Sequence, residues 1–116
     1  MTDQHNNNGV DYIEFNVNDI TKAKAFYGKA FGWTFTDYGP DYCEFNDGHR
    51  KGGFAATNGE IITGGALVVL YSTDLELALQ NIINAGGKIT KPIFEFPGGH
   101  RFHFTDPQGY ELAVWN

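Results

Sequence analysis

The strongest constraint on this chain is an internal repeat with a period of 55 residues. In each copy a strand-like apolar run is followed by an Asp, a helical stretch and a glycine. Asp19 and Asp74 are 55 positions apart, and so are Gly32 and Gly87. Self-similarity at a fixed period is typical of a duplicated structural unit. We therefore expect two copies of one module.

The repeat predicts one helix in each copy, at about 20–31 and 75–85. Asp19 and Asp74 can accept hydrogen bonds from the free N–H groups of the first helical turn, and their charge suits the helix dipole. Apolar residues recur at helical spacing, so each helix has one stripe to place against a sheet. These residues are Ile20, Ala23, Phe26, Tyr27, Ala30 and Phe31, and Leu75, Ala78, Leu79, Ile82 and Ile83.

Short apolar segments separated by turn residues predict the strands. Asp47-Gly48 favours a tight hairpin, and Asp106-Pro107-Gln108-Gly109 combines a proline preset for a turn with a glycine. Both copies then have the order βαβββ. The expected strands are 12–17, 33–38, 42–46 and 50–57 in the first copy, and 67–72, 88–96, 100–105 and 110–115 in the second.

Neither copy is expected to be stable alone, because one helix covers only one face of its sheet. We predict a disordered tail at 1–9 and a single α+β domain at 10–116. Its first module is at about 10–57, its linker at 58–65 and its second module at about 66–116. The two tandem βαβββ modules should form a curved mixed sheet of eight strands, with helices outside and a concave cleft for a ligand.

Composition narrows the possible partners. The net charge of −6 and the lack of basic runs argue against nucleic acid and anionic membranes. No apolar run is long enough for a membrane span, and the polar N-terminus does not resemble a signal peptide, so we expect a cytoplasmic protein. The single cysteine, Cys43, has no cationic neighbour to activate it and is expected to be reduced and inert.

Several segments resemble the glyoxalase / bleomycin resistance / dioxygenase superfamily, also called vicinal oxygen chelate proteins. The likeness spans about residues 10–115. It is carried by Val17-Asn18-Asp19, Ala25-Phe26-Tyr27, Phe31-Gly32-Trp33, Ala85-Gly86-Gly87-Lys88-Ile89 and the stretch from Phe104 through Asp106-Pro107-Gln108-Gly109 to Leu112.

The resemblance implies a paired βαβββ fold, commonly a homodimer, and a divalent metal that chelates neighbouring oxygens of a substrate. It assigns the metal-ligand positions to Tyr12, Gly52, Leu67 and Ala113. Three of these side chains have no donor atom, and the fourth is a phenol with a pKa near 10. His100 and His103 cannot replace them together, since residues three apart on a strand point to opposite faces. We therefore expect no metal and no other cofactor.

Strand alternation, applied to the positions that the resemblance supplies, predicts which residues line the cleft. The set is mainly aromatic and aliphatic, which suits a small, partly apolar or aromatic molecule held by stacking and a few hydrogen bonds. The expected ligand-binding residues are Tyr12, Asn16, Arg50, Phe54, Leu67, Val69, Tyr71, Ala113 and Trp115.

Glu14 and Glu111 are the candidate catalytic residues, since a carboxylate between apolar walls can act as a general base. The alternative is that each is a solvated side chain or the partner of an arginine. Arg101 and His103 share one strand face and could recognise a carboxylate or phosphate if that face lines the cleft.

Three functions stay open from the sequence. The leading one is a metal-free protein that binds a small molecule in the cleft between the modules. The others are a metal-dependent lyase or isomerase of the glyoxalase type, and a resistance protein that sequesters a drug or toxin without chemistry.

Overall fold

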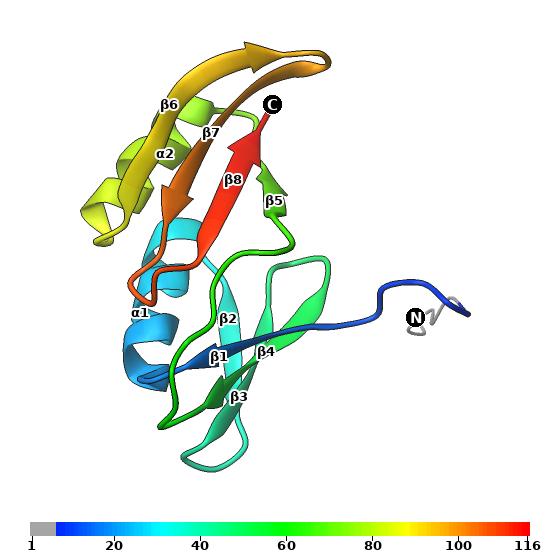
Figure 1. Ribbon diagram of the computed structural model, residues 1–116, viewed down its shortest axis with the longest axis vertical. Helices are drawn as coiled ribbons and strands as arrows, with labels where there is room; N and C mark the ends of the chain where they lie inside the picture. The colour runs from blue at the N-terminus through cyan, green and yellow to red at the C-terminus, as the bar shows by residue number, and fades with distance from the viewer. Residues whose placement is uncertain (1–6) are drawn as a thin grey trace.

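Each half of the chain folds as a strand, a helix and three further strands in the computed structural model, which describes residues 7–116 (Figure 1). The first half contains β1 (Ile13–Val17), α1 (Ile20–Phe31), β2 (Thr34–Asp37), β3 (Tyr42–Asn46) and β4 (Lys51–Ala56). The second contains β5 (Val68–Tyr71), α2 (Leu75–Asn84), β6 (Lys88–Phe96), β7 (Gly99–Thr105) and β8 (Glu111–Trp115). The predicted βαβββ order is confirmed in both halves. Most of the predicted tail, residues 1–6, lies outside the described residues.

The eight strands form two four-stranded sheets of the same topology. Their orders are β1-β4-β3-β2 and β5-β8-β7-β6. In each sheet the first strand runs parallel to the last, and the remaining pairs are antiparallel. The expected eight-stranded sheet is therefore divided into two sheets. The halves meet through α1 and α2, which pack against each other on one side of the molecule (Figure 1).

Both helices begin at the predicted capping residues. The Asp19 carboxylate accepts a hydrogen bond from the Lys22 N–H at 3.0 Å, and Asp74 accepts one from the Leu77 N–H at 3.1 Å. Gly32 ends α1 with a φ of 75°, a left-handed conformation that glycine adopts without steric cost. The repeat seen in the sequence is therefore a repeat of helix starts. At the other end α1 is capped by Gly32, whereas α2 is capped by Ala85, two residues before Gly87.

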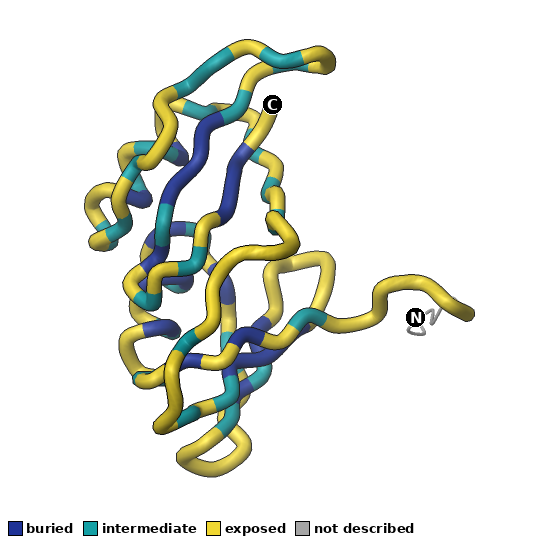
Figure 2. Tube along the Cα trace, in the orientation of Figure 1, coloured by how far each residue is buried: buried dark blue, intermediate teal, exposed yellow. Residues whose placement is uncertain are grey.

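The core lies between the helices and the strand faces that they cover, and it continues from one half to the other. Phe26 and Phe31 of α1 reach Phe104 of β7, with ring centroids 6.2 and 5.9 Å apart. The buried stretches of β7 and β8 are visible as dark segments in Figure 2. Cys43 is fully buried in this core, and burial raises the pKa of its thiol, as suits an inert cysteine.

A buried hydrogen bond joins the two modules. The Tyr27 hydroxyl on α1 donates to Asp106 Oδ2 at 2.7 Å. The other carboxylate oxygen of Asp106 accepts the backbone N–H groups of Gln108 and Tyr110 at 2.9 and 3.0 Å. The Tyr110 hydroxyl in turn donates to the carbonyl of Asn16 at 2.9 Å. The turn between β7 and β8 is therefore attached to the first module by side chains.

Replacing Tyr27 with Phe should lower the free energy of unfolding by about 1–3 kcal/mol, because the buried Asp106 oxygen would lose its donor. Urea denaturation measures this change. Tyr38→Phe is the matched control, since Tyr38 is 60% exposed and should change stability by less than about 0.5 kcal/mol. Equal stabilities of the two variants would contradict the structural role of this bond.

Burial raises the pKa of Asp106 above its ordinary value of 3.8, although its hydrogen bonds oppose the shift. The protonated form therefore favours the folded state, and this contribution to stability is present below pH 3.8 and is lost as pH rises through the folded pKa. The stability advantage of the wild type over Asp106→Asn should accordingly shrink as pH rises from that region toward neutrality. Urea denaturation of both proteins across this range checks the sign, and a constant difference would refute it.

Candidate functional site

Each sheet has one face that its helix does not cover. We call the face of the first sheet that carries Tyr12, Glu14, Asn16, Tyr42 and Gly53 the first open face. The second open face is the corresponding face of the second sheet. Cross-strand register and ring contacts assign to it Val69, Tyr71, Phe94, Phe96, Arg101, His103, Glu111, Ala113 and Trp115.

The first open face holds a chain of hydroxyl groups that ends on a carboxylate. The Tyr12 hydroxyl donates to Glu14 Oε1 at 2.7 Å, and the Tyr42 hydroxyl lies 2.5 Å from that of Tyr12. Because Tyr12 already donates to Glu14, Tyr42 is the donor in the second bond. Both hydroxyls lie over Gly53, where a Cβ atom would collide with them. A glycine at this position therefore makes the cluster possible.

Tyr12 keeps its proton in this arrangement. Its partial burial raises the pKa of the phenol most, and the hydrogen bonds to Tyr42 and Glu14 raise it further. The Tyr12 hydroxyl is consequently a hydrogen-bond donor at neutral pH, and Glu14 accepts its hydrogen bond.

The second open face carries an aromatic cluster built around an arginine. The guanidinium carbon of Arg101 lies 5.5 Å from the ring centroid of Phe94 and 5.2 Å from that of Phe96. Trp115 packs edge-on to Phe96 and Tyr71, with centroids 6.3 and 5.2 Å apart. A pocket of about 200 Å³ opens here, and it is lined by Val69, Phe96, Arg101 and Trp115.

A histidine and a glutamate are paired on the same face. His103 Nδ1 lies 3.0 Å from Glu111 Oε2, and the Thr90 hydroxyl donates to the same oxygen at 3.4 Å. The His103 side chain is only 6% exposed, whereas that of Glu111 is 46% exposed. Because Glu111 is held by His103 and Glu14 by Tyr12, the two carboxylates belong to separate clusters.

Two buried nitrogen atoms of β7 have no hydrogen-bond partner among residues 7–116. They are His103 Nε2 and Arg101 Nε. A buried polar group without a partner costs about 1–3 kcal/mol, so proteins rarely leave one unpaired without a functional reason.

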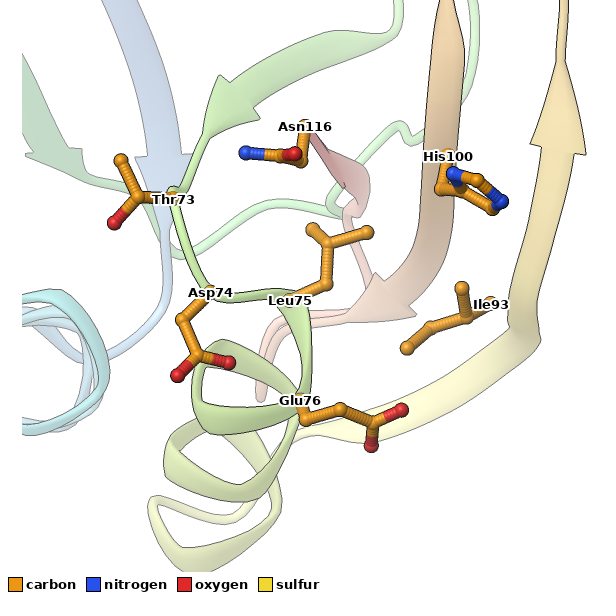
Figure 3. A pocket seen from close by; sticks show the side chains of 7 residues that line it. All are labelled: Thr73, Asp74, Leu75, Glu76, Ile93, His100 and Asn116. Carbon is orange, nitrogen blue, oxygen red and sulfur yellow. The ribbon is translucent and has the colours of Figure 1, made fainter.

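A second pocket, of about 260 Å³, lies at the start of α2 (Figure 3). The side chains that line it come from the segment before α2, the first turn of α2, β6, β7 and the residue after β8. They are Thr73, Asp74, Leu75, Glu76, Ile93, His100 and Asn116. Asp74 is already engaged as the helix cap. Both described pockets are therefore formed by the second module, and neither spans the two modules.

Most predicted site residues lie on the two open faces. Tyr12, Glu14 and Asn16 share the first, while the second carries Val69, Tyr71, Glu111, Ala113 and Trp115. Leu67 directly precedes β5 and is 37% exposed. Ala113 lies on the second face but is fully covered by its neighbours.

Phe54 and Arg50 do not have the predicted positions. Phe54 is fully buried in the core, where it packs against Phe15 and Tyr27 with centroids 6.1 and 5.4 Å apart. The prediction was wrong because it took Gly52 as the outward position of β4, whereas a Cβ at Gly52 would collide with the core residue Phe45. Arg50 precedes β4 in the hairpin turn, where its guanidinium donates to the Val10 carbonyl at 3.3 Å.

The alternation of β7 carried a signal that the sequence analysis did not use fully. Phe102 and Phe104 are the apolar positions of this strand and face the core. Arg101 and His103 therefore have to face the open side, together with whatever the neighbouring strands place there. Tyr42 was missed as a partner of Tyr12, because the contact depends on the pairing of β3 with β4.

The residues at the positions that the resemblance assigns to a metal do not fit one. The Tyr12 phenol is protonated and hydrogen-bonded, and Gly52 faces the core. Leu67 and Ala113 offer only hydrocarbon, whereas divalent ions need oxygen, nitrogen or sulfur donors. Within residues 7–116 no group of three or more His, Cys, Asp or Glu side chains is arranged to hold an ion.

A comparison with protein-family models identifies the family of this chain, and the paired βαβββ fold agrees with it. The family model described as Glyoxalase/Bleomycin resistance protein/Dioxygenase superfamily matches residues 9–114. The chain belongs to this superfamily. Over the part that the structure describes, neither helix is long and apolar enough to cross a lipid bilayer.

Among curated proteins, the chain is 24% identical over 123 residues to the Mycobacterium bovis protein named "Putative glyoxylase CFP32". The match covers 90% of this chain and 44% of that protein, so the chain spans less than half the length of the curated relatives it matches.

Solved structures share the fold at low sequence identity. A glyoxalase-related enzyme from Fulvimarina pelagi matches with a TM-score of 0.78 and 18% identity, over 92% of this chain and 86% of that one. The fosfomycin resistance protein FosX from Listeria monocytogenes, solved with Mn(II) and 1S,2S-dihydroxypropylphosphonic acid, matches with a TM-score of 0.79 and 16% identity. That match covers 92% of this chain and 88% of the other.

Phe54→Ala should lower the free energy of unfolding by about 3–5 kcal/mol, because it leaves a cavity among buried aromatic rings. Val69→Ala removes an apolar side chain that is 41% exposed and should cost under about 1 kcal/mol. Urea denaturation compares the two. A small effect of Phe54→Ala would mean that this ring is not a core residue.

Proposed function

We propose that the chain binds a small, partly apolar or aromatic molecule on the second open face, without the divalent metal of the superfamily. The observation that carries the proposal is the pocket lined by Val69, Phe96, Arg101 and Trp115. Three of its four lining side chains are apolar or aromatic and the fourth is cationic, which suits stacking on a planar molecule and attraction of its negative charge.

The proposed site uses the second open face because an aromatic pocket opens there and the aromatic side chains around it are accessible. Tyr71 is 60% exposed and Trp115 is 36% exposed, whereas the large aromatic residues of the core are covered. Exposed apolar groups gathered at a pocket favour a ligand site over a purely structural role. The homodimer and the cytoplasmic location stay predictions, and so does the use of a cleft between modules.

Metal independence is supported by the side chains at the expected ligand positions. Leu67 and Ala113 have no donor atom, and the proton of Tyr12 is held by its hydrogen bond to Glu14. The proposed binding therefore depends on ring contacts and the arginine. A glyoxalase-type lyase or isomerase would instead need a bound cation.

The test uses 8-anilino-1-naphthalenesulfonate, an anionic aromatic dye, titrated into the folded protein and followed by dye fluorescence. We expect saturable binding that Trp115→Ala weakens by about tenfold or more, since buried aromatic contacts dominate such sites. Tyr38→Ala, an exposed tyrosine of the first module, is the control and should leave the affinity within about twofold.

Prior treatment with EDTA should leave the dye affinity unchanged, and elemental analysis of the purified protein should find no stoichiometric metal. Loss of binding after EDTA would overturn the metal-free proposal. Failure of Trp115→Ala to weaken binding would overturn the assignment to the second open face.

A further inference from the structure

The two unpartnered nitrogen atoms belong to Arg101 and His103, which share the outward face of β7. Arg101 lines the proposed pocket directly, and His103 is two residues further along the same strand. Residues i and i+2 of a strand share a face and lie about 6–7 Å apart. A small molecule in the pocket is therefore close to both side chains, and it has to displace the groups that bury the two nitrogen atoms in order to bond to them.

The partner of His103 decides what its free nitrogen can do. Nδ1 faces Glu111 Oε2 at 3.0 Å, and an ionised carboxylate can only accept a hydrogen bond. Nδ1 therefore carries the proton in the neutral ring, and Nε2 is left as an acceptor. Glu111 is a positioning residue here, because it sets the tautomer and orientation of the imidazole.

Arg101 supplies the complementary group. Its Nε–H is always a donor, and it is buried without a partner among the described residues. The rings of Phe94 and Phe96 hold the guanidinium by cation–π contacts, which restrict its orientation. The second open face thus presents a positively charged hydrogen-bond donor, the Arg101 guanidinium, and an acceptor two residues away, His103 Nε2.

We propose that Arg101 and His103 form a two-point site for a planar aromatic acid that carries a hydroxyl group beside its carboxylate. The carboxylate accepts from Arg101, the hydroxyl donates to His103 Nε2, and the ring packs against Phe96 and Trp115. This inference rests on the proposed function and adds the chemical class of the ligand. Glu111, which the sequence suggested as a general base, here orients the histidine that contacts the ligand.

The ligand class is tested by isothermal titration calorimetry with salicylate and with benzoate, which lacks the hydroxyl. In the wild type, salicylate should bind at least about tenfold more tightly, as expected when a buried acceptor gains its donor. Arg101→Met keeps an apolar side chain but removes the positive charge, so it should weaken the binding of both salicylate and benzoate. Equal affinities for the two acids in a protein that still binds the naphthalene dye would overturn this inference and leave the proposed function standing.

Two substitutions of His103 distinguish the role of its Nδ1 atom from that of its Nε2 atom. His103→Asn places an amide near the position of Nδ1 and should abolish the preference for salicylate, with benzoate affinity within about twofold of wild type. His103→Gln reaches the position of Nε2 and should retain part of the preference. A preference unchanged in His103→Asn would overturn the assignment. Circular dichroism and urea denaturation check that both variants fold.

A measurement on the wild type does not depend on these variants. In ¹⁵N-histidine NMR spectra, the Nε2 resonance of His103, the imidazole in contact with Phe94, should shift when salicylate is added. Benzoate should cause a much smaller shift of the same resonance. The absence of any salicylate-specific shift would overturn the proposal. Failure of the dye to bind would instead overturn the proposed function and this inference together.

Discussion

The buried hydrogen bond between Tyr27 and Asp106 is the contact on which the arrangement of the two modules depends. Tyr27 belongs to α1, and Asp106 begins the turn between β7 and β8. The carboxylate also organises that turn, since it accepts the backbone N–H groups of Gln108 and Tyr110. One side chain thus holds the first helix, the turn and the two central strands of the second sheet together.

This contact between the modules determines which sheet faces remain accessible. With α1 and α2 packed against each other, the core lies beneath the helices and the opposite face of each sheet stays open. The first open face carries the protonated cluster of Tyr12, Tyr42 and Glu14. The second combines an aromatic pocket with the His103–Glu111 pair, and it is the stronger candidate for ligand binding because two of its buried nitrogen atoms lack partners.

The periodicities of the sequence predicted the helices and strands well and the residues of the candidate site less well. Capping residues and turn dipeptides act locally, so the helices predicted at about 20–31 and 75–85 and the eight strands were readable from neighbouring residues, and the second helix ends at Asn84. Strand alternation also placed Arg101 and His103 on one face of their strand. It failed at β4, where the adjacent glycines Gly52 and Gly53 give no apolar signal to identify the inward face. Phe54 was placed outward because the resemblance supplied Gly52 as the outward position of this strand, and it is in fact a core residue.

The sequence by itself determined the duplicated module and the starts of its helices, because these depend on residue identity and short-range spacing. It also showed that the positions which the resemblance assigns to a metal have few donor atoms. Tertiary structure alone decided that the strands form two sheets, that Tyr12 meets Tyr42 over Gly53, and that His103 is buried against Glu111. These side-chain contacts join segments that are distant in the sequence, and only the register of β-pairing within each sheet brings them together.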